Sequence, residues 1–144
     1  MTTNGGARAR VLVIDDEPQI GRAVQRSLEA GGLEVAVAVT GEDGLDQAAA
    51  SSPDLIVVDL GLPDIDGLRV IERLRSWSDV PVLVLSGAED EPTKVQALEL
   101  GADDFVSKPF GVAELRARVA AGRPIRYLTP PGVASAIATR SLYR

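Results

Sequence analysis

Short runs rich in β-branched residues alternate five times with longer amphipathic stretches, and this rhythm leaves very few folds open to the chain. The apolar runs cover residues 11–14, 33–39, 55–58, 80–85 and 105–106. The amphipathic stretches cover about 18–30, 41–50, 67–77, 92–100 and 112–121. Runs of the first kind are typical of buried strands, and stretches of the second kind are typical of helices. The pattern therefore predicts a (βα)5 protein.

Strands that alternate with helices favour right-handed crossovers and a parallel sheet that is covered on both faces. Five strands in this rhythm fit the flavodoxin-like, doubly wound α/β fold with strand order 2-1-3-4-5. In such a sheet the functional site lies beyond the carboxyl ends of the strands. We therefore expect the chemistry of this chain in the residues that end the first, third, fourth and fifth strands.

The chain has 144 residues, which is the length of one domain. We expect a flexible extension at 1–9, the folded domain at 10–121, and a partly disordered basic tail at 122–144. All 21 acidic residues lie in 1–114, whereas 115–144 carries six arginines and no acid. The tail shows no DNA-binding domain. No apolar run approaches the ~20 residues of a membrane span, so we expect a cytoplasmic protein without membrane contact.

The complete absence of cysteine and histidine excludes several classes of chemistry. Without cysteine the chain has no disulfide, no thiolate nucleophile and no zinc–sulfur site. Without histidine it has no Ser-His-Asp triad and no imidazole ligand. Carboxylates, hydroxyls, lysine and arginine remain, and the oxygen atoms of the carboxylates and hydroxyls suit hard cations such as Mg²⁺. Lysine is rare, because Lys94 and Lys108 stand against 13 arginines.

Polar residues follow the predicted strands in a way that suggests a shared site. They are Asp15, Asp16 and Glu17 after the first strand, Asp59 after the third, Ser86 after the fourth and Lys108 after the fifth. Crowded carboxylates repel one another unless a cation neutralises them. The cluster therefore predicts a Mg²⁺ site that also receives phosphate, with Asp59 as the nucleophile. A loop that cradles phosphate through backbone amides is excluded, since Asp15 and Asp16 would repel a bare phosphate.

Four stretches make the chain similar to the receiver domain of two-component response regulators. They read VLVIDDEP, DLIVVDLGLPDIDG, VPVLVLSG and GADDFVSKPF, and the resemblance covers roughly residues 10–121. The stretches LGLPD, RSWSDVPVLVLS and KPFGVAEL most resemble regulators of Kdp potassium-transport operons. These regulators belong to the OmpR/PhoB-type group, which carries a C-terminal winged-helix DNA-binding domain.

The resemblance implies a role for each matching residue. Asp59 would accept a phosphoryl group from a sensor histidine kinase, and Lys108 would hold that group. Asp16, Asp59 and the Gly61 carbonyl would ligate Mg²⁺, with Asp15 acting through a bound water. Ser86 and Phe105 would be the switch residues that respond to phosphorylation. The chain would not be an enzyme beyond its own phosphorylation and dephosphorylation.

The resemblance also implies a homodimer that forms on phosphorylation. The face would consist of the fourth helix, fifth strand and fifth helix, with DNA bound only through a domain absent here. The residues that match this face are Lys94, Val95, Leu98, Asp103, Asp104, Glu114, Ala117 and Arg118. Lys94 would pair with Glu114, and Asp103 or Asp104 with Arg118. Gly122 and Pro124 should end the fifth helix early, near residue 121.

Three other functions compete with a phosphorylated transcription regulator. A single-domain regulator would act through protein contacts alone. An aspartate-nucleophile phosphatase of the haloacid-dehalogenase type would need a second aspartate where Gly61 stands. A binding module with a decayed site would not need Asp16, Asp59, Ser86 and Lys108, all of which are present.

Overall fold

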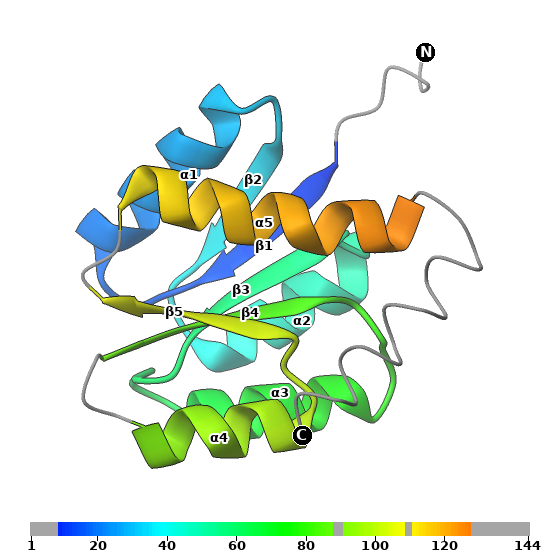
Figure 1. Ribbon diagram of the computed structural model, residues 1–144. Helices are drawn as coiled ribbons and strands as arrows, with labels where there is room; N and C mark the ends of the chain where they lie inside the picture. The colour runs from blue at the N-terminus through cyan, green and yellow to red at the C-terminus, as the bar shows by residue number, and fades with distance from the viewer. Residues whose placement is uncertain (1–8, 88–90, 109–110, 128–144) are drawn as a thin grey trace.

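Strands and helices alternate strictly along the residues that the computed structural model describes, which are 9–87, 91–108 and 111–127. The strands are β1 (Arg10–Ile14), β2 (Glu34–Ala38), β3 (Leu55–Asp59), β4 (Val82–Gly87) and β5 (Asp104–Lys108). The helices are α1 (Pro18–Ala30), α2 (Gly41–Ser51), α3 (Gly67–Arg75), α4 (Glu91–Leu100) and α5 (Val112–Tyr127). The predicted (βα)5 order is confirmed (Figure 1).

The five strands form one parallel sheet in the order β2-β1-β3-β4-β5, as the sequence pattern predicts. Figure 1 shows α1 and α5 on one face of this sheet and α3 and α4 on the other. The helix α2 packs on the same face as α3, because its Leu45 and Ala48 share an apolar cluster with Val70 and Ile71 of α3. The chain therefore has three layers, with two helices above the sheet and three below.

Two apolar cores, one on each face of the sheet, hold these layers together. Alternate residues of a strand point to opposite faces, so each strand contributes to both cores. In β3, for example, Ile56 and Val58 join one cluster, while Leu55 and Val57 join the other. All five residues of β3 are buried, which makes it the central strand in burial as well as in order. None of the helices within the described ranges combines the length and apolarity needed to cross a bilayer.

The prediction that the fifth helix ends near residue 121 is wrong, because α5 continues to Tyr127. Proline inside a helix removes one backbone donor, and glycine has a low helix propensity, but neither forbids extension of a helix that already exists. The first turns of α5 are held against the sheet by Leu115 and Val119, which are fully buried. Residues 122–127 thus belong to α5, and the remainder of the expected tail, 128–144, lies outside the described residues.

Two strands extend further toward their carboxyl ends than the apolar runs suggest. The strand β4 includes Ser86 and Gly87, and β5 includes Ser107 and Lys108. Their register pairs Ser86 with Ser107 and Gly87 with Lys108. The predicted site residues of these strands are therefore held by the hydrogen-bond ladder of the sheet.

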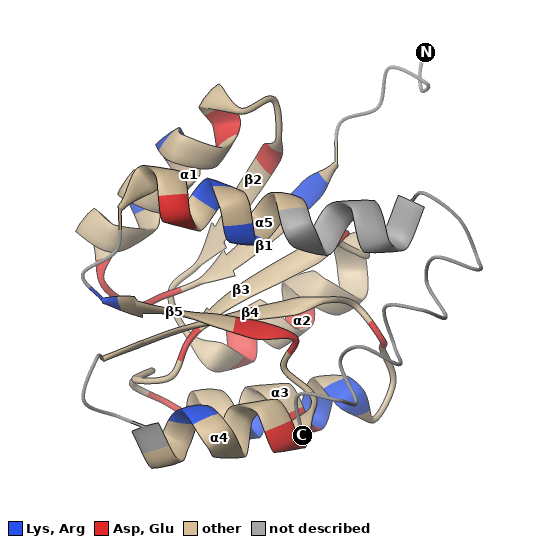
Figure 2. Ribbon diagram, viewed as in Figure 1, with Lys and Arg blue, Asp and Glu red and all other residues tan. Residues whose placement is uncertain are grey.

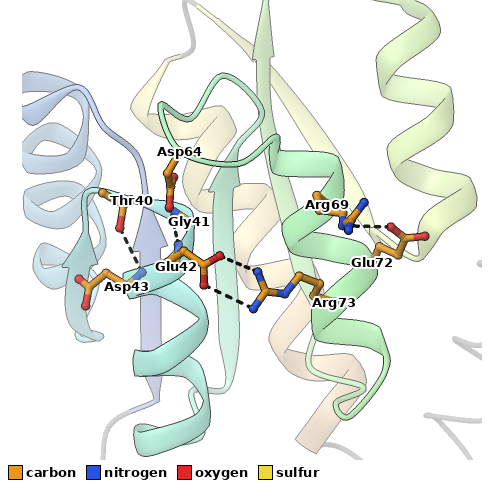
Figure 3. A network of polar contacts seen from close by, with 8 residues as sticks. All are labelled: Thr40, Gly41, Glu42, Asp43, Asp64, Arg69, Glu72 and Arg73. Atoms are coloured by element: carbon orange, nitrogen blue, oxygen red, sulfur yellow. Dashed lines mark hydrogen bonds and ion pairs between the residues drawn. The ribbon is translucent and has the colours of Figure 1, made fainter.

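The loop between β3 and α3 is fastened to the first turn of α2 by Asp64 (Figure 3). The two carboxylate oxygens of Asp64 accept hydrogen bonds from the backbone amides of Gly41 (2.8 Å) and Glu42 (2.9 Å). The next amide, of Asp43, is capped by the Thr40 hydroxyl at 3.1 Å. A carboxylate at this position satisfies amides that the helix cannot, and it also complements the positive end of the helix dipole.

Glu42 extends this network from α2 to α3. Its carboxylate pairs with the guanidinium of Arg73, with the nearest atoms 2.8 Å apart (Figure 3). The loop that directly follows β3 is consequently bounded by two helices that are linked to each other.

We predict that the free energy of unfolding falls less between pH 6 and pH 2.5 in Asp64→Asn than in the wild type. The hydrogen bonds from Glu42 and Gly41 lower the pKa of Asp64 below its ordinary value. A carboxyl group with a lowered pKa in the folded state stabilises the fold above its unfolded pKa, and this contribution is lost as the pH falls through the folded pKa. Urea denaturation at pH values from 6 down to 2.5 measures the effect. A wild-type acid profile in Asp64→Asn would contradict this role.

Candidate functional site

Three carboxylates meet at the carboxyl ends of β1 and β3. Asp15, Glu17 and Asp59 each place an oxygen within 4.8 Å of the others. The side chain of Asp15 is fully buried and that of Asp59 is 7% exposed, whereas that of Glu17 is 57% exposed. Figure 2 shows the basic end of β5 at the same edge of the sheet as these acidic segments. The convergence expected from the strand ends is thus present.

Lys108 crosses the edge of the sheet from β5 and neutralises part of this charge. Its ammonium donates hydrogen bonds to Asp59 Oδ1 at 3.0 Å and to Glu17 Oε1 at 3.3 Å. Its distance from Asp15 Oδ2 is 4.0 Å, which is an ion pair without a hydrogen bond. One ammonium therefore contacts all three carboxylates.

The electrostatics of the site raise two pKa values. Burial raises the pKa of Asp15 to about 6; the charge of Asp59 adds to this effect, and the hydrogen bond from the Glu17 amide opposes it. Burial disfavours the charge of Lys108, but the hydrogen bond and charge of Asp59 outweigh it, so the pKa of the ammonium lies above its ordinary value. The carboxylate of Asp59 therefore favours the charged form of Lys108.

Asp16 stands apart from this group. It is half-buried, and its oxygens are not among those that lie within 4.8 Å of one another. The chain bends at Asp16, just beyond the end of β1, and Asp15 and Glu17 lie on either side of this bend. The sequence placed Glu17 after the first strand without giving it a role. The signal that could have identified it is its spacing of two residues from Asp15.

Ser86 and Gly61 flank Asp59. Ser86 is buried, and its hydroxyl oxygen has no hydrogen-bond partner within the described part of the chain. Gly61 is exposed, and a Cβ built there would lie 3.9 Å from Asp59 Oδ2, which is an ordinary contact distance. The site therefore has a buried hydroxyl at the end of β4 and an exposed glycine close to Asp59 Oδ2.

The donor set at this edge fits a hard divalent cation. Asp15 Oδ2 is buried and accepts no hydrogen bond from any described residue, although its other oxygen accepts one from the Glu17 amide at 2.9 Å. A buried carboxylate oxygen without a partner is costly, and a cation would satisfy it. Chemically, the arrangement can bind a cation and present a buried carboxylate, Asp59, beside an ammonium.

The residues expected on a dimer face lie on α4, β5 and α5, apart from Asp103, which directly precedes β5. Lys94 of α4 is not exposed as that role suggests. Only 5% of Lys94 is accessible, and its ammonium donates to the Ser107 hydroxyl at 2.7 Å. The same ammonium lies 4.9 Å from the centre of the Phe105 ring. Phe105 is half-buried and packs against the core beneath α4. The long aliphatic stem of lysine explains how a charged group is accommodated there.

The two neighbouring aspartates of this face have different partners. Asp104 pairs with Arg118 of the same chain at 2.9 Å. Asp103 instead accepts hydrogen bonds from the Val82 amide at 2.8 Å and from Arg75 at 3.3 Å. Within one chain Arg118 therefore pairs with Asp104, while Asp103 closes the start of β4, and the pairing of either acid with Arg118 across a dimer stays a prediction.

The remaining members of this face differ in exposure. Val95 is an exposed large apolar residue at 48%, and Leu98 is half-buried against the core. Glu114 and Ala117 are exposed on α5. The surface between α4 and α5 thus combines an apolar patch with charges at its edge.

Most of the chain matches a known protein family. Residues 11–120 match the model of the response regulator receiver domain, and this range contains every site residue described above. The chain is a response regulator receiver domain. It is accordingly a module of two-component signal transduction.

The relatives of this receiver domain are regulators of transcription. The chain is 51% identical over 109 residues to the KDP operon transcriptional regulatory protein KdpE of Escherichia coli K12, covering 76% of this chain and 48% of that protein. It is 52% identical over 111 residues to KdpE of Mycobacterium tuberculosis H37Rv, covering 77% and 49% of the two chains. The chain thus spans about half the length of these relatives.

Solved structures agree with the fold of this receiver domain. A putative response regulator from Chloroflexus aurantiacus has a TM-score of 0.78 and 32% identity, and the match covers 81% of this chain and 98% of the other. The predicted resemblance to Kdp-type regulators and to the flavodoxin-like fold is therefore confirmed.

We predict that replacing Asp15 with asparagine stabilises the receiver domain in the absence of metal. A carboxyl group whose pKa is raised on folding costs stability as the pH rises from its unfolded pKa through its folded pKa of about 6. The gain should be on the order of 2–3 kcal/mol at pH 7.5 and should vanish near pH 4. Urea denaturation in EDTA measures it. Asp16→Asn is the control, and an equal gain in that variant would contradict the assignment.

Proposed function

We propose that Asp59 is the residue that this receiver domain uses to accept a phosphoryl group from the phosphohistidine of a sensor kinase. The observation that carries the proposal is the position of the Asp59 carboxylate, which is buried at the end of the central strand and hydrogen-bonded to Lys108 at 3.0 Å. A carboxylate has the oxygen that an acyl phosphate requires, and the ammonium beside it can stabilise the transferred group. A small donor such as acetyl phosphate would serve equally.

In the transfer, one carboxylate oxygen of Asp59 forms a bond to phosphorus. The bond between phosphorus and the imidazole nitrogen of the donor breaks, and that nitrogen keeps the electron pair. The ammonium of Lys108 would bond the oxygens of the transferred phosphoryl group, because it already lies beside the oxygen of Asp59. Ser86 supplies a hydroxyl, since its oxygen is buried nearby without a partner in the described residues.

We propose Mg²⁺ as the cation of the site, because oxygen donors in small number suit it. Bound there, Mg²⁺ would reduce the repulsion between the phosphoryl donor and the carboxylates. Asp59 and Asp15 are the buried candidates to hold it, and Glu17 joins them in the structure. Asp16 and the Gly61 carbonyl remain proposed ligands on the strength of the family resemblance.

Phosphorylation would act by shifting an equilibrium between two arrangements of the face formed by α4, β5 and α5. Ser86 would move toward the phosphoryl group, and Phe105 would turn into the space that Ser86 leaves. A phosphoryl group can shift such an equilibrium only by binding one arrangement better than the other. The displaced face would then form a symmetric homodimer through Val95, Leu98 and Ala117.

A longer protein would use this dimer to regulate transcription. The relatives are transcriptional regulators of about twice the matched length, and DNA would be contacted through a domain outside this sequence. A cytoplasmic setting suits a partner kinase that transfers phosphoryl groups there. Outside its own phosphorylation and dephosphorylation we assign the chain no catalytic activity.

Replacing Asp59 with asparagine should abolish acid-labile labelling by radioactive acetyl phosphate in Mg²⁺. An amide is too weak a nucleophile to replace the carboxylate oxygen. The control is Asp54→Asn, which alters a carboxylate that precedes the same strand and bonds the Arg10 amide at 2.8 Å. The control should label as the wild type does. Labelling of Asp59→Asn at the wild-type level would refute the assignment of the nucleophile.

Replacing Val95 with glutamate should weaken the dimer without affecting phosphorylation. A charge in the centre of an apolar patch is buried without a partner when the dimer forms, and we expect a loss of at least about tenfold in dimer affinity. Sedimentation equilibrium with beryllofluoride, a phosphoryl mimic, measures it. Val39→Glu is the control, because Val39 is similarly exposed but follows β2 at the other edge of the sheet. Equal dimerisation of the Val95 variant and the wild type would exclude this face.

A further inference from the structure

Lys94 is a buried cation that the phosphoryl chemistry does not use. Only 5% of it is exposed, and lysine is rarely so deeply buried in folded proteins. Its ammonium contacts two residues of β5, the Ser107 hydroxyl at 2.7 Å and the Phe105 ring at 4.9 Å from its centre. An ammonium within about 6 Å of a ring centre is attracted to the face of that ring.

One contact falls on a proposed switch residue, Phe105, and the other falls on Ser107, beside the second switch residue, Ser86. Phe105 and Ser107 are two positions apart on β5, so they share one face of the sheet. In the register of β4 and β5, Ser107 is the partner of Ser86, and Phe105 is the partner of Val84. Lys94 therefore contacts the aromatic switch residue directly and the serine beside the switch hydroxyl.

The geometry points to Lys94 as a positioning residue that holds Phe105 and Ser107 in their unphosphorylated arrangement and so opposes activation. The inference rests on the proposed function, since it concerns the residues that would move on phosphorylation of Asp59. To turn inward, the Phe105 ring must leave the ammonium that it faces. An inward turn of the ring on phosphorylation would break the contact at 4.9 Å, and contacts that only one arrangement makes lower the population of the other.

The inference also gives meaning to the expected pairing between Lys94 and Glu114 of a second copy. Glu114 is exposed at the start of α5, whereas the ammonium of Lys94 is buried against β5. The ammonium must leave Ser107 before it can reach a partner subunit. Both the turn of Phe105 and the formation of the dimer would then require the release of Lys94 from Ser107, and this requirement would link the two events.

The test follows Phe105 itself. The chain has two phenylalanines, Phe105 and Phe110, so uniform labelling with 4-fluorophenylalanine gives two fluorine resonances. The variant Phe110→Leu assigns them. In the wild type, beryllofluoride with Mg²⁺ should shift the Phe105 resonance. In Lys94→Met, which keeps the length of the side chain, the resonance without beryllofluoride should already lie toward the shifted position.

The rate of phosphorylation provides an independent measurement. At protein concentrations that keep the chain monomeric, Lys94→Met should be labelled by acetyl phosphate about three- to tenfold faster than the wild type. Ser107→Ala, which removes the hydrogen bond but leaves the dimer face intact, should change both readouts in the same direction by less. Glu99→Gln alters an exposed charge of α4 and should change neither.

The outcomes separate this inference from the proposed function. Wild-type resonances and rates in both Lys94→Met and Ser107→Ala would overturn the role of Lys94. If Lys94→Met fails to fold, Ser107→Ala alone still tests the role of Lys94, because a serine-to-alanine change is small. If the wild type itself neither accepts phosphate nor responds to beryllofluoride, the proposed function fails instead.

Discussion

Electrostatic repulsion among carboxylates at the edge of the sheet is the constraint on which the rest of the structure depends. Three carboxylate oxygens lie within 4.8 Å of one another, and two of the three side chains are buried. Like charges at such distances destabilise a fold unless a cation lies among them. The two apolar cores on either side of the sheet must supply the stability that the site removes. The site is consequently a place where the fold sacrifices stability to keep a charge imbalance that a ligand can relieve.

The partial neutralisation by Lys108 makes the site sensitive to the position of β5. Lys108 belongs to β5 and reaches Asp59 on β3, so its ammonium crosses the end of β4, where Ser86 lies. A phosphoryl group on Asp59 would offer new oxygen acceptors to this ammonium and to the hydroxyl of Ser86, which has no hydrogen-bond partner among the described residues. Any resulting displacement would be transmitted along β5 to the face that it shares with α4 and α5. The strand order itself thus connects the charged site with a distant surface.

Hydrophobic periodicity was sufficient to predict every strand and helix, because each element has one or two buried faces that repeat along the chain. It could not predict that β4 and β5 continue through Ser86 and Lys108, since polar residues at strand ends carry no apolar signal. It also failed at the end of α5, where Gly122 and Pro124 favoured an early stop. Packing of the preceding turns against the sheet outweighed this local preference.

The sequence predicted which residues lie near the site better than it predicted which side chains contact one another. The strand ends identified Asp15, Asp59, Ser86 and Lys108, because parallel strands bring their carboxyl ends together. The surroundings of Lys94 could not be predicted, since a lysine on an amphipathic helix is usually exposed. The contact between its ammonium and Ser107 depends on the packing of α4 against β5, which is a tertiary feature without a local signal.

The rarity of lysine acquires a structural meaning from these contacts. The chain has two lysines, and the ammonium of each contacts or belongs to β5. Lys108, at the end of this strand, donates a hydrogen bond to Asp59. Lys94 of α4 donates a hydrogen bond to Ser107, the residue before Lys108. A compact ammonium can make such a contact in a small space, where the planar guanidinium of arginine would need a wider one. The two ammonium groups thus link the end of β5 to different neighbours, because Lys108 bonds Asp59 of β3 and Ser107 bonds Lys94 of α4.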